Sequence, residues 1–158
     1  MKARIGNPRI VEGIEGLRAI VGEALGPSPG IVVDQAAVQA FADATGDHQW
    51  IHLDVRRAES TPFGGTIVHG YFVLGLVPTL LFGELLRIEG VQTILNYGAD
   101  KLRFPDVARV GSEITLRATL ESLTPRPPGE LATFGLTFTA SGSTKPCCVA
   151  QILLLLLP

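Results

Sequence analysis

Acidic and imidazole side chains crowd a short stretch of the chain: Asp47, His48, His52 and Asp54, followed by His69. Asp47 and His52 are five residues apart. In a loop, a carboxylate and an imidazole at that separation can converge on one small molecule, each within hydrogen-bond reach. Both groups accept hydrogen bonds when the imidazole is neutral, so together they can hold and polarise a water molecule. The stretch therefore predicts acid–base chemistry on a bound water.

A glycine-bounded segment, residues 65–70 (GTIVHG), leads directly into a strongly apolar run. If that run is a helix, its first turn carries unpaired N–H groups and the positive end of the helix dipole. Such a place stabilises an oxygen that gains negative charge during a reaction. Gly70 has no Cβ, so a ligand can approach its N–H closely. Together the two segments predict a water-holding pair beside an oxyanion site.

Each of these residues also has a purely structural interpretation. Asp47 follows Gly46 and suits a turn. His52 lies between two apolar residues and suits a hydrogen-bonded core histidine. Gly70 can simply ease entry into a tightly packed helix. His48 and His52, with acids on either side, could instead bind a metal ion, but no third ligand is evident, and we predict no metal site.

The first part of the chain predicts helices. Apolar residues recur at helical spacing over 11–25 and predict an amphipathic helix. Residues 31–33 predict a short strand. Asp34 then suits the N-cap of a second helix, which Gly46 would end.

The rest of the chain predicts a buried helix followed by a sheet. Residues 46–70 are irregular and rich in turn formers, which is typical of functional segments. The run 72–86 is apolar on nearly every side and predicts a buried helix, kinked at Pro78. Four later segments predict antiparallel strands, two of them with clear period-two alternation: 91–104, 113–120, 132–138 and 146–157. The order indicates an α+β fold.

Composition restricts the function classes. The 158 residues are 46% hydrophobic and 18% charged, which suits a single domain over 1–158. A net charge of −2 without like-charge blocks predicts no nucleic-acid partner. No apolar run is long enough to span a membrane, and no signal-peptide pattern is visible. The adjacent Cys147 and Cys148 would form a strained disulfide, so reduced thiols and a cytoplasmic location are expected.

Two segments taken together resemble a known family. Residues 41–54 (FADATGDHQWIHLD), followed by 62–70 (PFGGTIVHG), resemble the hydratase motif of MaoC-like hot-dog proteins. Gln49 and Trp50, the N-terminal segment and residues 96–105 (NYGADKLRFP) resemble the nodulation-protein-N-like branch. The resemblance covers roughly residues 11–158, and the two-part motif is far more specific than either half.

The resemblance implies a fold and an assembly. The expected hot-dog fold has a long central helix wrapped by a curved antiparallel sheet. We expect an N-terminal helical extension over 11–29, a hot-dog core over 30–158, and a homodimer. A serine that supports the catalytic acid in well-known hydratases aligns with Pro78, which cannot donate a hydrogen bond. Asp47 therefore needs another partner, and Thr79 is a candidate.

The resemblance also implies an activity. It indicates an (R)-specific enoyl-CoA hydratase of fatty acid metabolism, which adds water reversibly to a trans-2-enoyl thioester. Asp47 and His52 would be the catalytic pair, and the backbone N–H of Gly70 would bind the thioester oxygen. The partner would be an acyl-CoA or acyl-carrier thioester, and no cofactor is expected beyond the coenzyme A of the substrate. Two alternatives remain: an acyl-CoA thioesterase, and a non-catalytic acyl-thioester-binding protein, which Pro78 favours.

Overall fold

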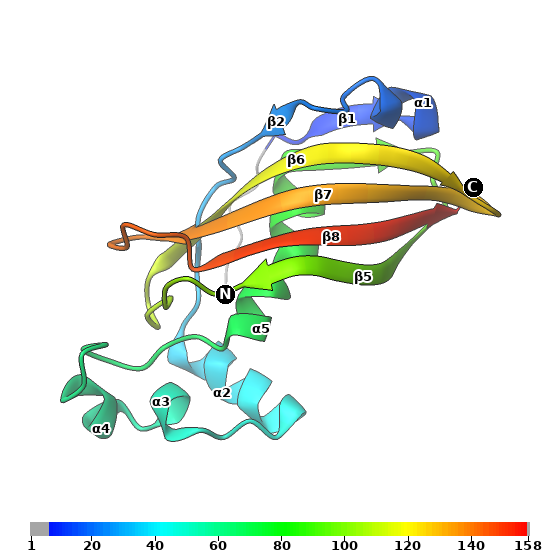
Figure 1. Cartoon of the computed structure of the whole chain (residues 1–158). Coiled ribbons are helices and arrows are strands. Elements are labelled where there is room, and N and C mark those ends of the chain that lie inside the picture. Colours follow the sequence, from blue (N-terminus) through cyan, green and yellow to red (C-terminus); the bar gives the residue numbers. More distant parts are fainter. Residues whose placement is uncertain (1–6, 158) are drawn as a thin grey trace.

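A curved antiparallel sheet packs around a central helical segment in the computed structural model, which describes residues 7–157 (Figure 1). The six-stranded sheet has the order β2-β6-β7-β8-β5, and β3 also pairs with β6. Its strands are β2 (Ala24–Leu25), β3 (Ile31–Val32), β5 (Thr93–Arg103), β6 (Glu113–Arg126), β7 (Gly129–Ala140) and β8 (Cys148–Leu157). All four predicted long strands are therefore present, and the predicted α+β class is confirmed.

Period-two alternation decides which face of the sheet is buried. In β6, Ile114, Leu116 and Leu120 are fully buried, and in β7 Phe134 and Phe138 face the same core. Both strands are longer than the predicted segments 113–120 and 132–138, because β6 continues to Arg126 and β7 begins at Gly129. A Cβ at Gly129 would lie 1.9 Å from the Leu156 carbonyl oxygen, so only glycine allows this close approach of β7 to β8.

The central helix consists of two pieces. The α-helix α5 spans Gly70–Leu74, and the π-helix η1 spans Pro78–Leu85. Pro78 has no N–H to bond to the carbonyl four residues earlier, and its ring displaces that carbonyl, so the regular helix stops before it and resumes with wider turns. The sequence predicted a kink at Pro78, and the change from α-helix to π-helix falls at this residue. The predicted helical end at residue 86 is wrong by one residue, because Leu86 already begins strand β4 (Leu86–Glu89).

The predicted helix over 11–25 is wrong. The segment instead forms β1 (Arg9–Glu12), the short helix α1 (Gly13–Arg18) and β2, and β1 pairs in parallel with β4. Gly13 and Gly22 adopt φ angles of 58° and 86°, which a continuous right-handed helix excludes. The apolar spacing reflected burial of Leu17 and Leu25 in the common core rather than a single helical face.

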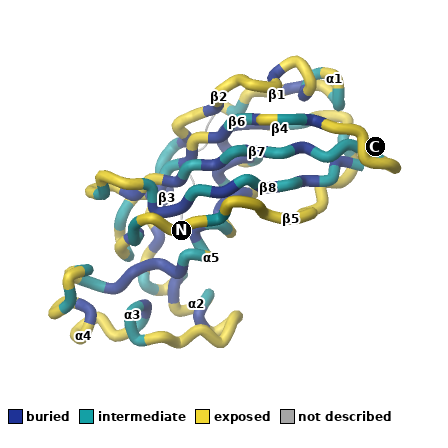
Figure 2. The backbone as a smooth tube through the Cα atoms, in the orientation of Figure 1, coloured by how far each residue is buried: buried dark blue, intermediate teal, exposed yellow. Residues whose placement is uncertain are grey.

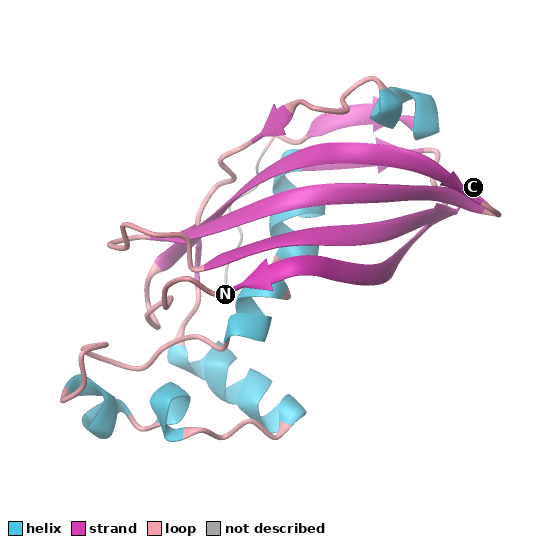
Figure 3. Cartoon of the chain, in the orientation of Figure 1, coloured by secondary structure: helices cyan, strands magenta, loops and turns pink. Residues whose placement is uncertain are grey.

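Three helices gather beyond one end of the sheet, next to the start of α5 (Figure 3). They are α2 (Gln35–Thr45), α3 (Trp50–Leu53) and α4 (Val55–Glu59). The Asp34 side chain accepts a hydrogen bond of 2.8 Å from the Ala37 N–H, and Gly46 ends α2 with a φ of 78°. Both predicted limits of α2 are therefore confirmed.

The core lies between the sheet and the central helical segment, and the burial pattern follows it (Figure 2). Cys147 and Cys148 are free and buried in this core. Burial raises the pKa of Cys147 to about 11 and that of Cys148 to about 12, so both thiols stay protonated and serve as apolar packing groups. No helix among residues 7–157 is long and apolar enough to cross a membrane.

Candidate active site

The predicted site residues meet at one cavity of about 240 Å³, below the start of α5. Asp47 reaches it from the end of α2, His52 from α3, and Gly70 from the first position of α5. The cavity is lined by Phe41, Thr45, Asp47, His52, His69, Gly70 and Tyr71. The structure thus brings together all three residues that the sequence singled out.

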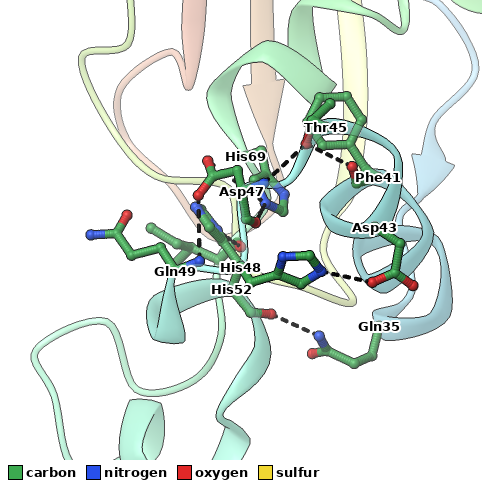
Figure 4. Close-up of polar contacts among 10 residues, drawn as sticks. Gln35, Phe41, Asp43, Thr45, Asp47, His48, Gln49, His52 and His69 are labelled. Carbon is green, nitrogen blue, oxygen red and sulfur yellow. Dashed lines mark hydrogen bonds and ion pairs between the residues drawn. The ribbon is translucent and has the colours of Figure 1, made fainter.

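Asp47 owes its position to the end of α2. Gly46 turns the chain in the left-handed conformation, and the Asp47 side chain remains 54% exposed. One carboxylate oxygen accepts a hydrogen bond of 3.4 Å from the Gln49 N–H, and the other lies 4.0 Å from His69 Nε2 (Figure 4). The predicted partner Thr79 is therefore wrong: Gln49 and His69 take that place.

His52 is held as a neutral hydrogen-bond acceptor. Its ring is buried, and Nδ1 lies 2.7 Å from the Ile67 carbonyl oxygen, to which it donates. The proton is then on Nδ1, so Nε2 keeps its lone pair. Burial lowers the pKa of His52, and His69 adds to this, whereas the Ile67 carbonyl and Asp47 act in the opposite direction. A carboxylate oxygen of Asp47 and a ring nitrogen of His52 lie within 4.8 Å of each other, a separation that one water can bridge.

His69 is the residue whose role the sequence did not reveal. It is 2% exposed, and its ring stacks on that of His52 with centroids 3.7 Å apart. On its other side lies Phe41, with a centroid distance of 4.9 Å. His69 Nε2 donates to the Asp47 carbonyl oxygen at 3.0 Å (Figure 4). His69 thus links the backbone of Asp47 to the ring of His52 and fixes their relative positions.

Gln35 joins the two loops of the site. Its side-chain amide donates to the His52 carbonyl oxygen at 2.7 Å, and its carbonyl accepts from Thr66 Oγ1 at 2.7 Å. The Ile67 N–H also donates to the Ile51 carbonyl oxygen at 3.0 Å. These contacts connect α2, α3 and the segment before α5 across many residues of sequence, so no local pattern could have predicted them.

Gly70 is the first helical residue of α5, so its N–H has no helical partner. A Cβ at this position would lie 3.0 Å from three ring carbons of Phe104, which is tighter than ordinary contact. A side chain at position 70 would therefore require the Phe104 ring to move by a few tenths of an ångström. The sequence did not point to Phe104 as a neighbour of the site, since it follows strand β5 and is far from Gly70 along the chain.

The metal alternative based on His48 and His52 is not supported by the geometry. His48 turns away to Asp43, with Nε2 and Oδ1 2.8 Å apart, and this hydrogen bond lowers the pKa of Asp43. Asp47, His52 and His69 do offer ligand atoms within 4.8 Å of one another. However, the two rings are stacked with an interplanar angle of 23°, so their in-plane lone pairs cannot converge on one ion at the roughly 2 Å that zinc needs.

Several known proteins are similar to this chain in sequence. A family model described as a MaoC like domain matches residues 17–126. The chain is 42% identical over 144 residues to 3-hydroxyacyl-thioester dehydratase Z of Mycobacterium tuberculosis, which covers 90% of this chain and 95% of that protein. It is 37% identical over 135 residues to nodulation protein N of Rhizobium meliloti, covering 84% of each.

Solved structures show the same fold. The (R)-hydratase from A. caviae involved in PHA biosynthesis superimposes with a TM-score of 0.67 and 26% identity, over 87% of this chain and 96% of that one. A MaoC-like dehydratase from Rhodospirillum rubrum gives a TM-score of 0.67 and 27% identity, over 87% of this chain and 94% of that one. The central helical segment and its sheet are those of the hot-dog fold, and the chain belongs to the MaoC-like dehydratase family.

Proposed function

We propose that this protein is an (R)-specific enoyl-CoA hydratase, which adds water reversibly to a trans-2-enoyl thioester to give the (3R)-hydroxyacyl thioester. The observation that carries the proposal is the meeting of Asp47, His52 and Gly70 at one cavity. Support for the reaction class comes from the relationship to a 3-hydroxyacyl-thioester dehydratase, and support for the R configuration from the relationship to an (R)-hydratase.

In the proposed mechanism a water donates one hydrogen to the Asp47 carboxylate and the other to His52 Nε2. Asp47 removes a proton as the water oxygen bonds to C3 of the substrate. The electrons of the C2–C3 double bond move toward the thioester carbonyl, and its oxygen is stabilised by the Gly70 N–H. A proton returned from the pair to C2 completes the addition. The only atoms consumed are those of water, so we propose that no cofactor is needed beyond the coenzyme A or carrier of the substrate.

The test follows the ultraviolet absorbance of the conjugated enoyl thioester with crotonyl-CoA. Wild-type protein should remove the signal without releasing free thiol, and chiral analysis should find the R product. Asp47→Asn should lower kcat at least a hundredfold, since a positioned acid–base group contributes about that much or more.

Asp43→Asn is the matched control, because Asp43 is an equally exposed acid on the same segment but bonds to His48 outside the cavity. It should turn over like wild type. Release of thiol would instead identify a thioesterase. Acyl-CoA binding without turnover would identify an acyl-thioester-binding protein. Near-normal turnover in folded Asp47→Asn would remove Asp47 from the mechanism.

We further propose that the protein is a homodimer. Strand β5 forms an edge of the sheet, and its residues are largely exposed (Figure 2). They include the large apolar side chains of Ile94, Leu95 and Tyr97. An exposed apolar edge strand normally pairs with another strand, and a second copy of β5 would supply one. The cytoplasmic location stays a prediction.

A further inference from the structure

The ring of His52 has to present an unprotonated Nε2 to the cavity, and this requires its proton to stay on Nδ1. The Ile67 carbonyl oxygen accepts the hydrogen bond from Nδ1, at 2.7 Å. In an imidazole, the hydrogen bond made by one ring nitrogen decides which nitrogen carries the proton. The position of the Ile67 carbonyl relative to the His52 ring therefore decides whether Nε2 can accept a hydrogen from water.

Gln35 is bonded to the segments on both sides of this hydrogen bond. On the side of the ring, its amide donates to the His52 backbone carbonyl oxygen at 2.7 Å (Figure 4). On the side of the acceptor, its carbonyl accepts from Thr66 Oγ1 at 2.7 Å, and Thr66 directly precedes Ile67. The contacts close a circuit from the His52 backbone through Gln35 and Thr66 to the acceptor of its own ring nitrogen.

The circuit lies largely inside the protein. Thr66 and His52 are each 6% exposed, and Gln35 is half-buried at the first position of α2. Little water reaches these groups, so the loss of one hydrogen bond leaves its partner unpaired. A separate bond, from the Ile67 N–H to the Ile51 carbonyl oxygen at 3.0 Å, joins the same two segments without Gln35. Loss of Gln35 should therefore loosen the site rather than unfold it.

We propose that Gln35 and Thr66 are positioning residues, which keep the His52 proton on Nδ1 and so keep Nε2 available to the reacting water. The effect on turnover rests on the proposed function, whereas the effect on the ring does not. Neither side chain lines the cavity, so both act through His52. The titratable groups Asp47 and His69 face the His52 ring from the end of α2 and from the segment before α5, and the variants below leave both in place.

The test at Thr66 separates the hydroxyl group from the shape of the side chain. Thr66→Val keeps the branched shape and loses the donor to Gln35, whereas Thr66→Ser keeps the donor and loses a methyl group. Thr66→Val should lower kcat about tenfold with KM within about twofold, because a small misplacement of a reacting group is costly. Thr66→Ser should stay within about twofold of wild type. A larger loss in Thr66→Ser than in Thr66→Val would show that Thr66 only fills space and would overturn the inference.

Gln35→Met has a matched control on the same helix. Methionine keeps the length of the unbranched side chain and loses both hydrogen bonds. Gln39 lies one turn further along α2, and its amide donates to Asp43 Oδ1 at 2.9 Å, outside the cavity. Gln35→Met should lower kcat about tenfold, and Gln39→Met should turn over like wild type. Equal turnover in the two variants would overturn the inference.

NMR of the imidazole nitrogens separates this inference from the proposed reaction, because it needs no substrate. Wild-type His52 should show its proton on Nδ1 and an unprotonated Nε2. In Gln35→Met and Thr66→Val a measurable share of His52 should carry the proton on Nε2, while Thr66→Ser and Gln39→Met keep the wild-type spectrum. If the ring responds in this way but wild type hydrates nothing, only the proposed function fails. An unchanged His52 spectrum in both Gln35→Met and Thr66→Val overturns the inference whatever the activity.

Discussion

The chemistry of the site depends on the different hydrogen bonds made by two stacked histidines, His52 and His69. His52 donates through Nδ1 to Ile67 and keeps Nε2 as an acceptor, whereas His69 donates through Nε2 to the Asp47 backbone. His69 Nδ1 is buried and has no hydrogen-bond partner among the residues that the structure describes. His52 is thus held neutral by its burial, and its bond to Ile67 keeps the proton on Nδ1. A pair of cationic rings 3.7 Å apart would repel, which further favours neutral His52.

The pH dependence of activity should report this arrangement. Burial lowers the pKa of His52 below its ordinary 6.5, so the folded protein holds fewer protons there than the unfolded chain. His52 therefore lowers the free energy of unfolding only as the pH falls below 6.5, where the unfolded chain takes up a proton first. Above pH 6.5 its ring is neutral, and Nε2 can accept a hydrogen bond. The acid limb of kcat/KM should lie below pH 6.5, and NMR titration of the His52 ring should give the same value. A limb above pH 6.5 would contradict the neutral acceptor.

Replacement of His69 by phenylalanine should separate its two roles. His69→Phe keeps a flat ring against His52 but loses the hydrogen bond to Asp47, worth about 1 kcal/mol. We expect kcat to fall about fivefold with KM nearly constant. Because His69 lowers the pKa of His52, the acid limb should also move up toward pH 6.5. His48→Phe, outside the cavity, is the control. A stable His69→Phe protein with an unchanged kcat and pH profile would show that His69 only fills space.

At the level of elements, the end of α2 controls the site. Asp47 follows Gly46, whose left-handed conformation ends the helix. The turn directs the chain after α2 toward the start of α5. A Cβ at Gly46 would meet nothing within 4 Å, so substitution there strains only the backbone. The turn at Gly46 therefore helps to set the position of the Asp47 carboxylate, together with the contacts of Asp47 to Gln49 and His69.

Gly46→Ala should therefore affect both stability and activity. The left-handed conformation costs a non-glycine residue about 1–2 kcal/mol, which should appear as a lower free energy of unfolding in urea. A shifted Asp47 should also lower kcat. Gly142→Ala is the matched control, since Gly142 has a φ of 83°, also has open space around its Cβ position, and lies in the β7–β8 connection. It should lose similar stability and keep full activity. Equal activity in both variants would mean that α2 does not position Asp47.

For the whole molecule, the two edges of the sheet differ. At one edge the short strands β2 and β3 pair with β6. The other edge is β5, which has only β8 as a neighbour. Pairing of two β5 edges would join the sheets of two copies into one.

Light scattering should find a particle of twice the 16.8 kDa chain mass. Leu95→Glu should convert it to a monomer, because the substitution puts a charge on an apolar edge and brings like charges together across the interface. Val21→Glu is the control: Val21 is 40% exposed against 45% for Leu95, and it lies next to β2 at the opposite end of the sheet. A monomeric wild type, or dissociation by both variants, would contradict pairing through β5.

The sequence by itself determined the features that depend on near neighbours. Asp34 and Gly46 delimit α2 through contacts within a few residues, the alternation in β6 and β7 follows from burial of one face, and Pro78 interrupts the central helix. The two-part motif predicted the fold and brought Asp47 and His52 forward as candidates.

Only the tertiary structure decided the features that depend on distant residues. The helix predicted over 11–25 gives way to β1 because β4 offers a parallel partner, which no local spacing can show. Gln35, His69 and Phe104 join the site through contacts that span 17 to 31 residues or come from another element. Local backbone preferences act over one or two turns, whereas these contacts exist only after the sheet has closed around the central helix.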